Sequence, residues 1–235
     1  MVSTRYRGRA AGLSQADLEP AKWIALLAMA VDHYGKIVDP SVYLETHLIG
    51  RVSFPLFATI IGLRLALSPG LSGTYLRRLI PWAALSQPVF VLAGRDWYDG
   101  NILITLALGV GATWALRWGR EGQPAAAVLL LAALAPLTYF VEFGPLGVVM
   151  VPVTAALARA DAWRGLRASG PLGLLANASL HWPFLGPEGL TALLAAPLAA
   201  ASARLRIRLP RLPTAAFYAF FPGHLLALHV YGLYS

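Results

Sequence analysis

The first apolar segment of the chain reads Lys22-Trp23-Ile24-Ala25-Leu26-Leu27-Ala28-Met29-Ala30-Val31-Asp32-His33. It ends in two adjacent ionisable side chains, Asp32 and His33. An ionisable group near the centre of a bilayer-length helix costs roughly 2.5–3.5 kcal/mol on insertion scales. Such groups normally face other protein groups or water rather than lipid, and they mark functional sites. The pair is therefore the first indication of where a site lies.

Composition indicates a membrane protein. Hydrophobic residues make up 57% of the 235 positions, charged residues make up 13%, and the mean hydropathy is +0.61. A soluble domain carries about 25% charged residues. The net charge of +8 is spread between apolar segments without forming a basic run, so we expect no nucleic-acid partner. The chain has no cysteine, which excludes a disulfide framework, a thiolate nucleophile and a Cys-ligated zinc.

The apolar runs predict an all-α fold, a polytopic transmembrane helical bundle of about nine spans. Residues 1–20 are expected to form a polar cytoplasmic arm, and residues 21–235 a single transmembrane domain. Eight spans with one re-entrant hairpin is the alternative, because only the turn around Gly186-Pro187 separates the seventh and eighth runs. The expected limits are 21–38, 48–67, 75–94, 100–118, 124–142, 144–160, 170–185, 187–203 and 214–233.

The distribution of basic residues predicts the orientation. With the N-terminus in the cytoplasm, every Lys and Arg falls in an inner loop or at an inner span end except Lys36, Arg51 and Arg95. This asymmetry follows the positive-inside rule at every connection. It predicts a multi-pass protein with its C-terminus outside. The abundance of Ala, Arg, Gly and Pro is typical of a bacterial sequence, so we expect a bacterial inner (cytoplasmic) membrane.

Helical spacing places two chemically active groups on one stripe of the first span. Lys22 and His33 are eleven residues apart, which at about 100° per residue returns to within about 20° of the same face. Asp32 lies about 100° around from His33 and must face a different neighbour. One interpretation is catalytic. The other is structural, with Asp32 paired to Lys36 at i,i+4 and His33 bonded to another helix.

Three other polar residues stand within predicted spans. Arg51 cannot lose its charge, so it either reaches the outer interface or pairs with Asp32 or a ligand. Asn101 begins the fourth span and has the option of donating its amide into a cavity, while Gly109 permits close helix packing. His224 follows Pro222-Gly223, which predicts a kink, and a backbone carbonyl is one expected partner for its ring.

These residues fall in blocks that together resemble the TraX family of membrane acetyltransferases. The resemblance covers residues 22–228 in family order, and the blocks are specific as an ordered set. They are Lys22 to His33, Ile49 to Phe57, Asn101 to Gly109, a weaker block Glu142 to Gly147, and Phe217 to Leu228. The chain is also distantly similar to integral-membrane acyltransferases of surface sugars, where an Arg usually stands at the position of Lys22.

The resemblance implies acetyl transfer from acetyl-CoA, as co-substrate, to an acceptor amine, such as the N-terminus of a pilin-like protein. No metal or bound cofactor is implied. We expect His33 to act as general base, oriented by Asp32, and Arg51 or Asn101 to stabilise the oxyanion. The phosphates of CoA would meet basic side chains at the inner face, namely Lys22, Arg64, Arg77 and Arg78. His224 is a further expected substrate-binding residue.

Three other functions stay open at the level of sequence. An O-acyltransferase acting on a surface glycan, a lipid or another envelope acceptor would use the same groups. A small proton-coupled transporter would also place Asp32, His33 and His224 inside a bundle, although no inverted repeat is visible. A pilus assembly factor would need no catalytic site.

Overall fold

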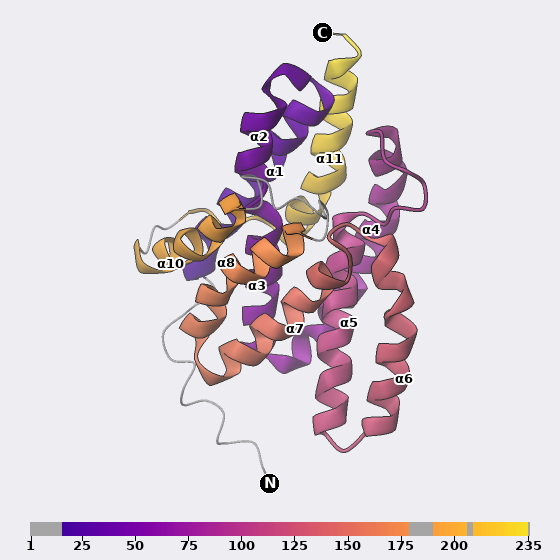
Figure 1. Ribbon diagram of the computed structural model, residues 1–235, viewed down its shortest axis with the longest axis vertical. Helices are drawn as coiled ribbons and strands as arrows, with labels where there is room; N and C mark the ends of the chain where they lie inside the picture. The colour runs from indigo at the N-terminus through magenta and orange to yellow at the C-terminus, as the bar shows by residue number, and fades with distance from the viewer. Residues whose placement is uncertain (1–15, 179–189, 206–208, 235) are drawn as a thin grey trace.

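The structure, a computed structural model, describes residues 16–178, 190–205 and 209–234. Within these ranges the chain is helical and contains no β-strand, in agreement with the predicted all-α class. Figure 1 shows α1, α2 and α11 together at one end and the α5–α6 hairpin at the other. The helices are α1 (Glu19–Ile37), α2 (Tyr43–Gly50), α3 (Ser53–Leu67), α4 (Ser72–Leu92), α5 (Ile102–Arg120), α6 (Pro124–Leu134), α7 (Gly144–Ala160), α8 (Ala162–Ala178), α10 (Ala195–Leu205) and α11 (Thr214–Gly232).

Most predicted spans coincide with a helix to within a few residues. The seventh, predicted at 170–185, does not: α8 begins at Ala162, so Arg164 and Arg167, which were expected in a loop, are helical. The second is divided, because the chain turns at Arg51–Val52 between α2 and α3. The fifth ends early as an α-helix: a 3-10 segment, Pro136–Phe140, follows α6, since Pro136 has no N–H to donate. The turn at Gly186-Pro187, which distinguishes eight spans from nine, lies outside the described residues, as do residues 1–15 of the predicted arm. Leu18, Glu19 and Pro20 are buried, so the exposed arm does not extend to residue 20.

Two described segments are long and apolar enough to cross a bilayer, Pro40–Leu67 and Ile102–Arg120. Shorter apolar helical segments follow at Pro124–Phe140, Gly144–Ala160 and Ala192–Arg204. The α6 helix is apolar throughout, yet Val128 is 64% exposed and Leu129 is 71% exposed. An apolar helix that leaves one side uncovered suits contact with lipid. These features fit a membrane protein, and the complete set of nine spans stays a prediction.

The α3 helix forms the centre of the bundle and contacts α1, α7 and α8. All but three of its fifteen residues are buried. Close packing depends on small residues: a Cβ at Gly62 would lie 2.9 Å from the Val151 carbonyl oxygen of α7, and one at Gly109 would lie 2.9 Å from Val151 Cβ. The expectation that Gly109 permits close helix approach is therefore confirmed.

The α1 and α2 helices pack against each other at one end of the bundle (Figure 1). Their connection is capped by Asp39, whose carboxylate accepts hydrogen bonds from the Ser41 backbone N–H at 3.0 Å and the Ser41 hydroxyl at 2.6 Å. A Cβ at Gly50 would overlap the Asp32 side chain. The absence of a side chain at Gly50 thus lets α2 approach the ionisable end of α1, where the site forms.

Candidate active site

The His33 ring on α1 meets the His224 ring on α11. His33 Nδ1 lies 2.8 Å from His224 Nε2, and His224 Nδ1 lies 2.7 Å from the Phe220 carbonyl oxygen. The expected carbonyl partner of His224 is present, and the expectation that His33 bonds to another helix is confirmed. The two imidazoles form a chain that ends on the backbone of α11.

This chain of hydrogen bonds determines which nitrogens carry protons when both rings are neutral. The Phe220 carbonyl can only accept, so His224 Nδ1 carries hydrogen and donates to it. His224 Nε2 then has a lone pair and accepts from His33 Nδ1–H. His33 Nε2 is consequently unprotonated. A neutral imidazole nitrogen of this kind is suited to remove a proton from a substrate.

Asp32 faces away from His33, toward α2. Its Oδ2 accepts a hydrogen bond from Lys36 Nζ at 2.5 Å, and its Oδ1 accepts one from His47 Nδ1 at 2.9 Å. Arg51 Nη2 lies 3.7 Å from the same Oδ1. The i,i+4 ion pair with Lys36 is therefore confirmed, and the group that orients His33 is His224 in place of the expected carboxylate of Asp32.

Arg51 is buried at the turn between α2 and α3 and does not extend to an interface. Its Nη1 donates to Asn177 Oδ1 of α8 at 3.1 Å, and its guanidinium lies 5.9 Å from the centre of the Phe143 ring. Its Nε has no hydrogen-bond partner among the described residues. A buried guanidinium N–H is costly to leave unpaired, so Arg51 has one donor that is not used within the described residues.

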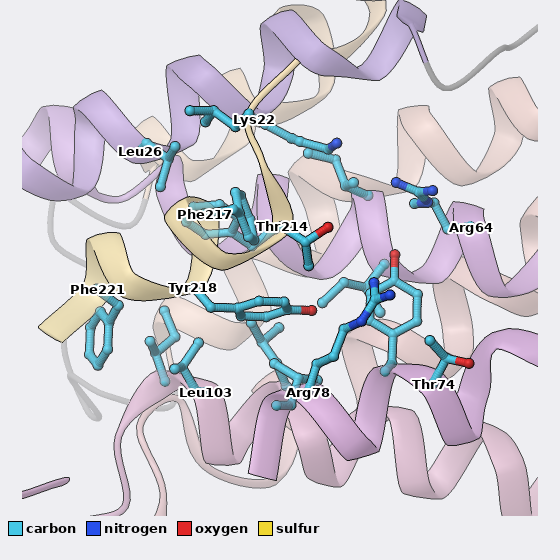
Figure 2. Close-up of a pocket in the computed structure, with 18 of the residues that line it drawn as sticks. Lys22, Leu26, Arg64, Thr74, Arg78, Leu103, Thr214, Phe217, Tyr218 and Phe221 are labelled. Atoms are coloured by element: carbon cyan, nitrogen blue, oxygen red, sulfur yellow. The ribbon is translucent and has the colours of Figure 1, made fainter. Parts of the chain in front are cut away.

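A cavity of about 130 Å³ lies between α1, α3, α4, α5 and α11. Four cationic side chains line it: Lys22, Arg64, Arg78 and Arg211. Figure 2 shows the charged ends of Lys22, Arg64 and Arg78 toward one end of this cavity, with Tyr218 between helices and Phe221 at the opposite end. The remaining walls are largely apolar. The cavity thus has a basic end and an apolar interior.

A second, smaller cavity of about 40 Å³ adjoins the first and is lined by His33, Asp32, Arg51, Arg95 and Glu142, among others. Three residues line both cavities, Met29, Ile102 and Phe221. The predicted stripe on α1 is confirmed in this sense: Lys22, Leu26 and Met29 face the first cavity, and Met29 and His33 face the second.

Three expected substrate contacts line neither cavity among the described residues: Arg77, Asn101 and His224, whose ring contacts His33. Arg77 is exposed beside Arg78. Asn101 is fully buried as the N-cap of α5: its Oδ1 accepts from Leu103 N–H at 3.0 Å, and its Nδ2 donates to the Ala83 carbonyl at 2.9 Å and to Gln87 Oε1 at 2.8 Å. An oxyanion contact by Asn101 would break one of these bonds, so Arg51 is the better placed donor.

Other residues at the site were not anticipated. Arg211 and Tyr218 line the first cavity, and His47 bonds Asp32 from α2. The spacing of His47 and Arg51, four residues apart, was the available signal for a shared helical face. At the basic end, Lys22 Nζ donates to the buried Glu19 at 2.5 Å, which fixes the position of its ammonium.

Comparison with known proteins identifies the family. The profile described as TraX protein matches residues 17–231. The chain is 37% identical over 145 residues to Protein TraX of Escherichia coli strain K12, and 36% identical over 143 residues to a second Protein TraX from Escherichia coli. Each alignment covers 60% of this chain and 56% of the relative, so the match spans little more than half of the relatives' length. No solved structure is significantly similar to the chain. Since the family profile matches nearly the whole sequence, the chain belongs to the TraX family.

Proposed function

We propose that this protein is an integral-membrane acetyltransferase that moves an acetyl group from acetyl-CoA to an acceptor amine. One observation carries the proposal: a cavity with a basic end adjoins a cavity lined by His33, whose ring is held by His224, and three residues line both cavities. A donor with a phosphorylated head and a flexible arm would place its head at the basic end of the first cavity and its arm along the apolar walls. An acid–base group at the far end of that arm is what acyl transfer requires.

The donor would bind with its phosphates against Lys22, Arg64, Arg78 and Arg211. Guanidinium and ammonium groups recognise phosphate through charge-assisted hydrogen bonds, and arginine does so with two parallel donors. The pantetheine arm would follow the apolar wall past Leu26 and Met29. Its thioester would then reach the wall shared by the cavities, next to His33.

The transfer step would use His33 Nε2 as general base. The neutral acceptor amine attacks the thioester carbonyl, and His33 takes one proton from its nitrogen as the C–N bond forms. The C–S bond then breaks, and His33 returns this proton to the departing thiolate, giving the amide and free CoA. His224 would stabilise the transient imidazolium of His33 through their hydrogen bond, with the Phe220 carbonyl holding His224. The unpaired Nε–H of Arg51 would stabilise the oxyanion.

The acceptor would approach the second cavity from the outer side of a bacterial inner membrane. A pilin-like protein N-terminus is the acceptor suggested by the family, and another envelope acceptor would meet the same groups. The N-terminus of the chain would be cytoplasmic, which puts the basic end of the first cavity on the side where acetyl-CoA is made.

The test is transfer of labelled acetyl from acetyl-CoA to peptide acceptors by membranes that contain the full chain. We expect His33→Ala to lower the transfer rate about 10²- to 10⁴-fold, the usual contribution of a general base. His229→Ala is the matched control, because His229 is on α11 with His224 but lines neither cavity.

Equal transfer by the wild-type protein and His33→Ala would overturn the proposal. A transporter would instead show His33-dependent flux without transfer, and an assembly factor would be indifferent to the substitution.

A further inference from the structure

The second cavity contains a carboxylate, Glu142, whose partner can be exchanged. Arg95 Nη2 lies 3.0 Å from Glu142 Oε1, and the Arg95 side chain is 43% exposed while that of Glu142 is 15% exposed. Because the Arg95 end of the pair is open to water, hydration replaces part of the attraction, and the pair contributes less net stability than a fully buried one. Another cation can therefore take the place of Arg95 at small cost.

Asp32 is the other carboxylate among the described residues that line this cavity, and it is already paired with side chains of the protein. Lys36, His47 and Arg51 all surround it, and it is buried. Together these partners compensate the charge of a buried carboxylate, and exchanging one of them for a ligand would weaken that compensation. A cationic ligand that enters beside His33 would therefore pair with Glu142 rather than with Asp32.

The backbone that carries Glu142 is held firmly. Its N–H donates to the Gly100 carbonyl at 3.0 Å, and its own carbonyl accepts from the Thr105 hydroxyl at 2.6 Å. The next residue, Phe143, has a left-handed backbone with φ of 63° and stacks on Phe54 with ring centres 4.0 Å apart. A left-handed conformation at a bulky residue is unfavourable and is maintained only by surrounding contacts. The carboxylate is thus presented to the cavity from a fixed position.

Arg95 has a second favourable contact near by. Its guanidinium carbon lies 5.6 Å from the centre of the buried Phe90 ring, within the range of a cation–π interaction. If another cation displaces Arg95 from Glu142, the guanidinium keeps its contact with Phe90. The cost of opening the pair is reduced accordingly.

We propose that Glu142 binds the ammonium group of the acceptor and that Arg95 occupies this place when no acceptor is bound. This assignment rests on the proposed function and specifies the acceptor as a cation rather than a hydroxyl compound. The bound ammonium loses one proton to solvent before attack, and His33 takes the second during transfer. Glu142 is therefore a specificity residue for amine over alcohol acceptors.

The first test measures binding in the absence of acetyl-CoA. The probes are a leucine-rich hexapeptide amide with a free N-terminal amine and its isostere with a hydroxyl in place of that amine. Binding is followed as the rise in Tm of the purified full-length protein in detergent. We expect Glu142→Gln to weaken amine binding about tenfold, the effect of losing one charge-assisted hydrogen bond, and to leave binding of the hydroxyl isostere unchanged. Arg95→Gln should strengthen amine binding about threefold by removing the competitor.

Glu121→Gln is the matched control, because Glu121 also pairs with an arginine, Arg117, but lines neither cavity. If Glu142→Gln leaves amine binding unchanged, or weakens the binding of both probes equally, the assignment of Glu142 as an ammonium site is wrong.

The second test measures transfer to the same probes. We expect Glu142→Gln to raise KM for the amine about tenfold while KM for acetyl-CoA is unchanged. An unchanged KM for the amine would overturn the assignment. Selective amine binding without transfer by the wild-type protein would retain the ammonium site and contradict the acetyltransferase proposal, so the two failures are distinguishable.

Discussion

Arg77 and Arg78 are neighbours in the chain with different surroundings. Arg78 lines the basic end of the first cavity, whereas Arg77 does not. If this end holds the phosphates of CoA, Arg78→Ala should raise KM for acetyl-CoA about tenfold, since a charge-assisted hydrogen bond contributes about 1.5–3 kcal/mol. Arg77→Ala should leave KM unchanged. The measurement is the KM of acetyl transfer, repeated with S-acetylpantetheine as donor.

S-acetylpantetheine lacks the phosphates, so Arg78→Ala should not change its KM. A similar rise in KM for both donors would contradict phosphate binding by Arg78.

Single residues were predictable from sequence where only local geometry is needed. The shared stripe of Lys22 and His33 and the ion pair of Asp32 with Lys36 follow from the helical period. The bond between His33 and His224 joins residues 191 positions apart, and no helical period tells which distant helix lies opposite. The sequence suggests that Asn101 stabilises the oxyanion, but Asn is also a preferred N-cap residue. In the structure its buried side chain caps the N-terminus of α5.

At the scale of helices, the contact of α1 with α2 depends on Gly50. Because a Cβ at this position would overlap Asp32, Gly50→Ala should force the helices apart and destabilise the fold by about 1–3 kcal/mol. Gly73→Ala in α4 is the control, since a Cβ there meets nothing within 4 Å. Thermal unfolding of the two purified variants in detergent gives the comparison. A Tm for Gly50→Ala at or above that of Gly73→Ala would show that this packing is not required.

The elements themselves were largely predictable, because apolar runs of membrane length indicate where helices lie, although α8 begins at Ala162, well before the predicted start at residue 170. The break between α2 and α3 was not anticipated, although the sequence contains a signal for it. Pro55 lies four residues after Arg51 and has no N–H to donate to the Arg51 carbonyl, which favours a break at this point. The contacts that Arg51 makes there, with Asp32 and Asn177, join distant parts of the chain and were not predictable.

For the whole molecule, the proposed orientation puts the two ends of α5 on opposite sides of the membrane. The natural chain has no cysteine, so single cysteines report accessibility without background. Tyr98 precedes α5 and Glu121 follows it, and both are exposed. We expect a membrane-impermeant maleimide to label Tyr98→Cys in cells with an intact inner membrane and Glu121→Cys only after permeabilisation. Labelling of both positions in intact cells, or the reverse pattern, would contradict the orientation.

Met29, Ile102 and Phe221 line both cavities, and the place where the cavities meet has a consequence for the supply of acetyl groups outside the membrane. In the proposed reaction only the acetyl group passes to the acceptor on the outer side. Free CoA leaves through the first cavity, by which acetyl-CoA entered. The compartment outside the membrane, which has no acetyl-CoA in this scheme, would thus receive one acetyl group per reaction without export of CoA.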